Sequence, residues 1–269
     1  GGWTASSQYW KSAEFLAWVA NNSTVASTVV WNDRWGTDTT CKHGSYWTCN
    51  DNYRPSNVVP HKWENCATVA KTSWGFDRNA TLEGYYTTKE LIDELIQTIA
   101  FGGNMLLNVG PSADGTISPI FVDRLLAVGD WLRVNGEAIY GTRVWPVVQN
   151  ETDGNVYYTV KNQGSASTSL PSTTLYAHLL QWPAQNNVQL HYPIPTNDTK
   201  IHMLGLPSSV NIKWAYKPSD GLSIQLPSLT PYNIPCQHSW VLAMTGLKNV
   251  EALDEEAEEN EDKKTSAVA

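Results

Sequence analysis

The sequence predicts an α/β part followed by an all-β part: the C-terminal part of a (β/α)8 barrel and then an antiparallel β-sandwich. In residues 1–140, apolar strands alternate with amphipathic helices, which is typical of a parallel sheet covered by helices. After residue 146, short β-type runs follow one another, separated by Gly, Pro, Asn and Ser. The 269 residues are sufficient for two such domains.

The helices and strands of the first part have recognisable ends. The apolar periodicity of Ser12–Asn22 predicts an amphipathic helix. Thr87 and Glu90 fit a capping box at the start of a second helix, and Met105–Val109 predicts the apolar strand that follows it. Pro119 predicts the first turn of a third helix. These elements alternate as βα units require.

A short strand is predicted at Val29–Trp31, directly before Asn32, Asp33 and Arg34. Chemistry in a βα barrel takes place at the carboxyl ends of its strands. We therefore expect this strand to place Arg34 at the catalytic face of the barrel.

The second part consists of predicted strands and an acidic tail. The strands are expected at residues 155–160, 174–182, 187–192, 211–216, 222–226 and 239–247. The predicted domain boundaries are 1–143 for the barrel part, 144–248 for the sandwich and 249–269 for the tail. We expect the acidic tail to be disordered, because it cannot bury enough apolar surface to become ordered.

Composition argues against two classes of function. The net charge is −8 and lies mostly in the tail, so no basic surface predicts nucleic-acid binding. No apolar run reaches the ~18 residues of a membrane span. The 13 Trp and 12 Tyr, against 4 Phe, are typical of surfaces that line carbohydrates, although we expect most of them to pack in the core.

Cysteines and glycosylation sequons point to the secretory pathway. Cys41 and Cys49 bracket a seven-residue loop that a disulfide can close, and Cys66 and Cys236 are expected to be buried thiols. Without a CxxC pattern or a Gly-rich phosphate cradle, we expect no metal and no cofactor. Sequons occur at Asn21, Asn22, Asn79, Asn150 and Asn197. The chain opens on Gly-Gly-Trp without a start Met or signal peptide, so its natural N-terminus is expected upstream.

The segment between residues 29 and 87 is dense in chemically useful side chains. They are the charged residues Asp33, Arg34, Asp51 and Glu64 and the aromatic residues Trp35, Trp47, Trp63 and Trp74. Paired carboxylates among aromatics suit glycoside hydrolysis, in which one acid protonates the leaving oxygen and another attacks or activates water. The alternative is that these carboxylates are solvated or salt-bridged, with Asp33 and Arg34 as a plain ion pair.

Longer motifs extend this pattern along the chain. They are NDRWG at 32–36, P-x-x-V-x-x-x-K-W-E-x-C at Pro55–Cys66, SWGF at 73–76, GGNMLLNVGPSADG at 102–115 and LLAVGDWLRVNGEAIYGT at 125–142. In this order they resemble the animal α-L-fucosidases of glycoside hydrolase family 29. Val58 stands where the family signature usually has Leu. The resemblance continues more loosely to about Lys248 and does not cover the tail.

The resemblance implies an exo-acting retaining hydrolase that removes terminal α-L-fucose from glycoproteins and other glycoconjugates. Its partners would be fucosylated glycans, it would use no cofactor, and it would be lysosomal or secreted; a homo-oligomer stays open. In the family, an Asp nucleophile directly precedes the residues that Gly1, Gly2 and Trp3 match. The nucleophile is therefore expected one position before Gly1, and residues 1–269 alone are expected to be inactive.

Four residues receive expected roles from the resemblance. Asp51 is the favoured acid/base and Glu64 the alternative, because this position is poorly fixed in the family. Arg34 is expected to contact the sugar and to keep the nucleophile ionised. Trp74 is expected to pack on the C6 methyl group of fucose, with core packing as its alternative role. The competing function is a non-catalytic fucose-binding or adhesion protein on the same fold.

Overall fold

The computed structural model describes residues 4–163 and 172–250, which form two compact units. The first unit holds residues 4–86 and 101–122, and the second holds residues 87–100 and those from 123 onward. Residues 251–269, nearly all of the predicted acidic tail, lie outside the described residues.

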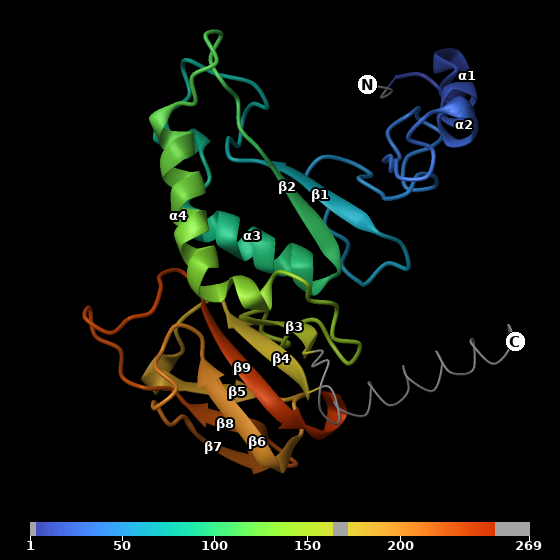
Figure 1. Ribbon diagram of the computed structural model, residues 1–269. Coiled ribbons are helices and arrows are strands. Elements are labelled where there is room, and N and C mark those ends of the chain that lie inside the picture. The colour runs from blue at the N-terminus through green and yellow to red at the C-terminus, as the bar shows by residue number, and fades with distance from the viewer. Residues whose placement is uncertain (1–3, 164–171, 251–269) are drawn as a thin grey trace, which may run out of the picture. The chain divides into compact units, whose positions relative to one another are not determined.

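The first unit is built around a two-stranded parallel sheet (Figure 1). Its elements are α1 (Ser7–Trp10), α2 (Ser12–Asn22), β1 (Trp63–Thr68), the 3-10 helix η1 (Leu82–Gly84) and β2 (Gly103–Asn108). The two strands pair in parallel, with Glu64 opposite Asn104. Trp47 adds a parallel bridge to Trp63, and the Trp47 carbonyl accepts a hydrogen bond from the Glu64 N–H at 2.8 Å. The segment around Trp47 therefore lies alongside β1 as a further short neighbour.

Most predicted elements of this unit are present. The helix predicted at Ser12–Asn22 is α2, and the strand predicted at Met105–Val109 corresponds to β2. The sequence analysis did not predict β1, because polar residues interrupt its apolar pattern. Alternate residues of β1 nevertheless bury one face of the strand through Trp63, Asn65 and Ala67.

The prediction of a strand at Val29–Trp31 is wrong, because this segment has no regular secondary structure. The N–H of Val29 closes a turn onto the carbonyl of Val25, and the carbonyl of Trp31 accepts from the N–H of Ser45. A strand needs a ladder of successive backbone partners, and these isolated bonds do not supply one.

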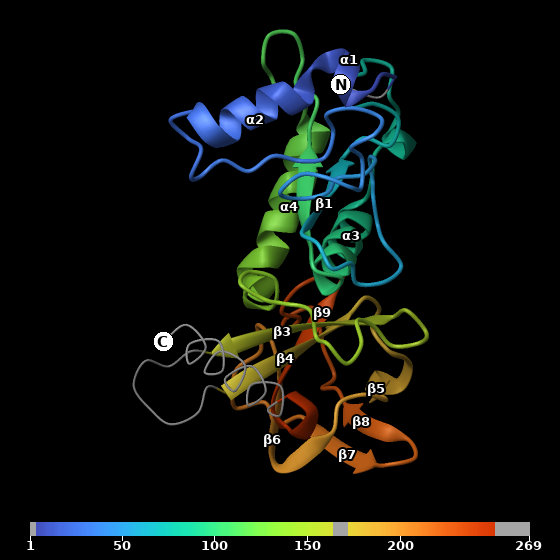
Figure 2. The same cartoon turned by 90° about the vertical axis from the view of Figure 1, so that its right-hand side faces the viewer.

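The second unit is mostly β-sheet, as predicted for the C-terminal part (Figure 2). Its strands are β3 (Val156–Gln163), β4 (Ser172–Leu179), β5 (Asn187–Leu190), β6 (Pro195–Met203), β7 (Lys213–Lys217), β8 (Gly221–Gln225) and β9 (Trp240–Leu247). They form a four-stranded sheet in the order β3-β4-β9-β6 and a three-stranded sheet in the order β5-β8-β7, both antiparallel. Every predicted strand of this part has a counterpart. The sequence analysis missed β6, whose first half carries Pro195, Asn197 and Asp198, residue types depleted in strands.

The two sheets share one apolar core. It joins side chains of the four-stranded sheet, such as Leu175, to side chains of the three-stranded sheet, such as Leu222, and both residues are fully buried. Trp145 is the largest fully buried side chain, and it packs edge-on against Tyr158 at a ring distance of 5.0 Å. Removing these apolar surfaces from water is the main stabilising contribution to such a core.

Helices pack against the four-stranded sheet within this unit. They are α3 (Thr88–Ala100) and α4 (Pro119–Asn135), and α4 continues into the 3-10 helix η2 (Gly136–Ala138). A second apolar cluster joins Ile92 and Ile96 of α3 and Trp131 of α4 to Tyr176 of β4 and Val241 of β9. Both predicted helices are therefore present, and their apolar faces contribute to the core of the second unit. Among the described residues, no helix is both long enough and apolar enough to cross a bilayer.

The predicted capping box is present at the start of α3. The hydroxyl of Thr87 accepts from the N–H of Glu90 at 3.2 Å and donates to the carboxylate of Glu90 at 2.9 Å. The same carboxylate accepts from the N–H of Thr87 at 2.7 Å. These bonds satisfy N–H groups that a helix start leaves without intrahelical partners.

We expect Thr87→Ala to lower the free energy of unfolding by about 1 kcal/mol, because the variant loses the capping hydroxyl. Chemical denaturation followed by circular dichroism would measure this change. Thr87→Ser keeps the hydroxyl and should stay close to wild type. Equal stability of Thr87→Ala and wild type would contradict a role of this cap in stability.

Candidate active site

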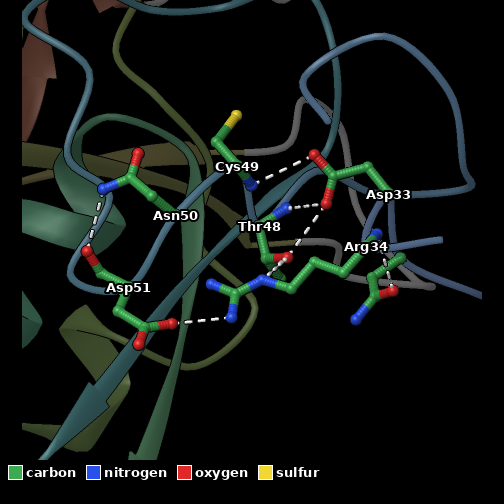
Figure 3. A network of polar contacts seen from close by, with 7 residues as sticks. Asp33, Arg34, Thr48, Cys49, Asn50 and Asp51 are labelled. Atoms are coloured by element: carbon green, nitrogen blue, oxygen red, sulfur yellow. Dashed lines mark hydrogen bonds and ion pairs between the residues drawn. The ribbon is translucent and has the colours of Figure 1, made fainter. Parts of the chain in front are cut away.

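A buried carboxylate, Asp33, organises the loop between Arg34 and Asp51 (Figure 3). One of its oxygens accepts hydrogen bonds from the N–H and the hydroxyl of Thr48, both at 2.9 Å. The other oxygen accepts from the N–H groups of Cys41 at 2.7 Å and Cys49 at 3.0 Å. Burial alone would raise the pKa of the Asp33 carboxyl, but these hydrogen bonds outweigh burial and hold the pKa below its usual value.

A disulfide joins Cys41 to Cys49, whose Cα atoms lie 4.9 Å apart. The loop between them is therefore closed both by a covalent bond and by hydrogen bonds to Asp33. The Asp33 carboxylate and the two sulfur atoms lie within 4.8 Å of one another. Metal binding by cysteine requires free thiolates, and these sulfurs are bonded to each other, so this cluster is not a metal site.

Thr48 connects Asp33 to Arg34. The hydroxyl group of Thr48 donates a hydrogen bond to Asp33 and accepts another from Nε–H of Arg34 at 2.7 Å. Nη1 of Arg34 lies 2.6 Å from Oδ1 of Asp51 in an ion pair (Figure 3). We call these four residues the Asp33 network. Arg34 is thus paired with Asp51, whereas the oxygens of Asp33 are occupied by the loop that it closes.

Of the two candidate acid/base residues, Glu64 lies in β1 and Asp51 lies beside it, and the two have different partners. The N–H of Asn52 donates to the carbonyl of Cys66 at 2.9 Å, which places Asp51 beside the later half of β1. Glu64 is the second residue of β1, and its carboxylate accepts from the side-chain amide of Asn104 at 3.1 Å. The Asp51 side chain is 40% exposed and paired with a cation, whereas Glu64 is tied to the neighbouring strand.

The Cys66 thiol lies among these charges. Burial raises its pKa, the guanidinium of Arg34 opposes this shift, and the carboxylates of Asp51 and Glu64 add to it. A thiol with a raised pKa stays protonated at neutral pH and is a poor nucleophile. Cys66 is therefore an inert neighbour of the Asp33 network. The expectation that Cys66 and Cys236 are buried thiols is wrong, because both residues are only partly buried.

The loop after β1 carries Trp74, whose side chain is 38% exposed. The side-chain amide of Asn108, at the end of β2, donates to the carbonyl of Trp74 at 2.8 Å and to the hydroxyl of Thr68 at 3.0 Å. Gly110 passes so close that a Cβ atom there would lie 2.5 Å from the carbonyl carbon of Gly75. The carboxyl end of β2 therefore holds the Trp74 loop in place.

The structure brings some of the predicted site residues into contact and places others separately. Arg34 and Asp51 form an ion pair, while Glu64 and Trp74 are held by Asn104 and Asn108. The sequence analysis assigned no role to Thr48, because a single threonine carries no chemical signature and its bridging position depends on the folded loop.

The predicted glycosylation sites lie on different elements. Asn21 and Asn22 end α2, Asn79 lies in a loop and Asn197 lies in β6, and all four are exposed. Asn150 is half-buried, and its side-chain amide donates to the carbonyl of Glu151 at 2.7 Å.

Carboxylates, an arginine and an exposed tryptophan next to parallel strands are the features of a glycoside hydrolase. Residues 1–137 match the family model described as alpha-L-fucosidase, and residues 149–245 match the model described as alpha-L-fucosidase C-terminal domain. The chain therefore belongs to the α-L-fucosidase family.

Known relatives agree with this assignment. The tissue alpha-L-fucosidase of Homo sapiens is 44% identical over 248 residues, which cover 92% of this chain and 51% of that protein. The plasma alpha-L-fucosidase of Homo sapiens is 42% identical over 90% of this chain and 50% of that protein. The chain thus spans about half the length of these relatives. The solved structure of alpha-L-fucosidase isoenzyme 1 from Paenibacillus thiaminolyticus has a similar fold, with a TM-score of 0.69 at 23% identity over 91% of this chain and 55% of that one.

We expect Asp33→Asn to lower the free energy of unfolding by about 2–3 kcal/mol, because the amide turns an accepting oxygen into a donor that faces N–H groups. Since folding lowers the pKa of Asp33, its stabilising contribution is present above the unfolded pKa of about 3.9. This contribution is lost as the pH falls through the folded-state pKa. Wild type should therefore lose stability below about pH 4, and Asp33→Asn should lose less over the same range.

Denaturant titrations at several pH values would measure both effects. The matched control is Glu14→Gln, an exposed carboxylate in the same unit, which should change stability by less than about 0.5 kcal/mol. An Asp33→Asn variant with the stability and pH dependence of wild type would show that the buried carboxylate is dispensable.

Proposed function

We propose that this chain is the C-terminal part of an exo-acting retaining α-L-fucosidase, which removes terminal α-L-fucose from glycoproteins and other glycoconjugates. The observation that carries the proposal is the Arg34–Asp51 pair, held by Asp33 and Thr48, in a chain of the α-L-fucosidase family. Family membership favours the enzyme over a non-catalytic fucose-binding protein on the same fold.

The barrel assignment belongs to this proposal. The parallel pairing of β1 with β2 and the parallel bridge from Trp47 to Trp63 support a (β/α)8 arrangement. In such a barrel, Arg34 and Asp51 would lie at the carboxyl side of the strands, together with the Trp74 loop.

We assign the acid/base role to Asp51. Its carboxylate is partly exposed and lies beside the later half of β1, whereas the carboxylate of Glu64 is bound to Asn104 near the start of the strand. In the first step, the nucleophile Asp, expected just before Gly1, forms a bond to C1 while the bond from C1 to the glycosidic oxygen breaks. Asp51 gives its proton to that oxygen, so the aglycone leaves as an alcohol. In the second step, Asp51 takes a proton from water, whose oxygen displaces the nucleophile and releases fucose with retained configuration.

Arg34 suits both steps of this cycle. The ion pair at 2.6 Å holds the Asp51 carboxylate in one position, from which it would take the proton of the attacking water in the second step. In the first step, the same guanidinium is proposed to contact the nucleophile carboxylate and to keep that carboxylate ionised and ready to attack. The two-pronged geometry of the arginine side chain allows it to contact two acceptors in turn.

Trp74 is proposed to provide the wall against the C6 methyl group of fucose. That methyl group distinguishes fucose from galactose, and burying one such group favours binding by about 0.8 kcal/mol. The exposed side chain of Trp74 is available for such a contact.

We propose a lysosomal or secreted location for the protein. The relatives are named as tissue and plasma enzymes, and sequons such as those at Asn79 and Asn197 lie on exposed residues. The disulfide between Cys41 and Cys49 also suits an oxidising compartment.

In the full-length enzyme, we expect Asp51→Ala to slow substrates with poor leaving groups far more than activated aryl fucosides, because only poor leaving groups need protonation. Azide should partly restore turnover of the activated substrate by replacing the base-assisted water. Steady-state kinetics on both substrate types would test this. The same pattern in Glu64→Ala, with Asp51→Ala unaffected, would transfer the role to Glu64.

We expect Arg34→Lys to lower kcat/KM by an amount that corresponds to about 1–3 kcal/mol of lost transition-state stabilisation, and Arg34→Met to lower it by more. Lysine keeps the positive charge, whereas methionine lacks both the charge and the planar two-pronged group that donates hydrogen bonds. Loss of the charge should also move the acidic limb of the pH–rate profile to higher pH, since the nucleophile would protonate more readily. Arg78→Met, at an exposed position in the same unit, is the matched control. Wild-type kcat/KM in Arg34→Met would leave Arg34 with a purely structural role.

A further inference from the structure

The second unit contains a cavity whose lining includes none of the residues of the proposed fucosidase site. It has a volume of about 360 Å³ and lies between the turn at residues 151–156 and the segment 179–191. Its lining residues include Trp182 and the amide-bearing residues Asn155, Gln181, Asn187 and Gln189. A volume above about 300 Å³, an aromatic wall and several polar groups are typical of small-ligand sites.

The polar groups around this cavity retain unused hydrogen-bonding capacity. The exposed amide of Gln181 has no hydrogen-bond partner among the described residues. The side-chain oxygen of Asn187 accepts a hydrogen bond from the Ser223 hydroxyl, so its NH2 group can donate to a ligand. The NH2 group of Gln189 donates to the carbonyl of Asp220, so its side-chain oxygen can accept from a ligand. The cavity therefore offers both donors and acceptors.

The charge of the lining selects against anions. Glu151 and Asp153 are carboxylates, and the described residues that line the cavity include no Lys or Arg. Glu151 is only 2% exposed, and it accepts from the Tyr158 hydroxyl and from the N–H of His191. Its other oxygen lies 2.8 Å from Nδ1 of His191, which orients the ring and leaves Nε2 for a ligand.

The aromatic wall is held in place before any ligand binds. Nε1 of Trp182 donates to the side-chain oxygen of Asn186 at 2.7 Å. The Trp182 ring packs edge-on against Trp240 with a centroid distance of 5.1 Å. A fixed ring and a fixed imidazole reduce the entropy that binding would otherwise cost.

We propose that this cavity binds a neutral pyranose ring of a glycan. The apolar C–H face of the ring would pack on Trp182, and its hydroxyl groups would exchange hydrogen bonds with Gln181, Asn187 and Gln189. A neutral sugar matches the lining, since hydroxyl groups donate to amide oxygens and accept from amide NH2 groups, while a sialylated or sulfated sugar meets two carboxylates and no lysine or arginine among the described lining residues. The second unit would thus hold glycans at a site distinct from the fucose-cleaving one.

The test uses N-acetyllactosamine as a neutral probe without fucose, and its sialylated form as the anionic counterpart. Binding to the full chain is measured by saturation-transfer NMR and by titration calorimetry. Gln181→Ala should weaken binding of the neutral probe about five-fold, as expected for one lost hydrogen bond. Trp182→Leu should weaken it further, and circular dichroism checks that both variants fold. Gln237→Ala, an exposed glutamine away from the cavity, is the matched control.

Arg34→Met separates this inference from the proposed fucosidase function, because it should leave binding of N-acetyllactosamine unchanged. Three outcomes would overturn the proposal. They are an absence of binding at the highest soluble probe concentration, wild-type affinity in folded Gln181→Ala and Trp182→Leu, and tighter binding of the sialylated probe.

Discussion

The carboxylate of Asp33, buried and surrounded by four hydrogen-bond donors, is the constraint on which the geometry of the candidate site depends. A buried carboxylate is costly unless its oxygens are satisfied, and here they are satisfied by the loop itself. The loop therefore has to adopt one conformation. In that conformation the Thr48 hydroxyl serves two partners, and it fixes the guanidinium of Arg34 from the side opposite to its ion pair with Asp51. An apolar residue in place of Asp33 would leave three N–H groups without an acceptor.

This arrangement separates the rigid part of the candidate site from the side chain that is proposed to react. Asp33 and the disulfide between Cys41 and Cys49 hold the loop, while the side chain of Asp51, two residues after Cys49, stays partly exposed. The Trp74 loop is held in another way, by Asn108 and by the close approach of Gly110. In both cases supporting side chains bind main-chain groups of the loop, so the side chains of Asp51 and Trp74 stay partly exposed. The second unit adds a cavity whose aromatic and polar side chains are likewise held by neighbours.

Periodicity and capping signals predicted the long helices, and short β-type runs separated by Gly, Pro, Asn and Ser predicted the β-rich part, because these features depend on local sequence. The segment at Val29–Trp31 misled the prediction, since three β-type residues do not make a strand without neighbours to pair with. Neither β1 nor β6 was predicted, because their polar residues interrupt the apolar pattern in the sequence. The buried face of each strand is evident only in the folded units. Motif resemblance found Arg34 and Asp51 but not their contact with each other, and it gave no role to Thr48. Such contacts join residues that are far apart in the sequence, and neither composition nor spacing reports them.

The central claim is that the loop closed by Asp33 acts on catalysis through the position of Arg34. A double-mutant cycle on kcat/KM of the full-length enzyme, with Thr48→Val and Arg34→Met, tests it most directly. Thr48→Val removes the bridging hydroxyl and keeps the shape of the side chain. We expect Thr48→Val alone to lower kcat/KM by about ten-fold and to cause little further loss in the Arg34→Met background, with a coupling energy above about 1 kcal/mol. Losses that add independently, or a Thr48→Val enzyme as active as wild type, would contradict the account.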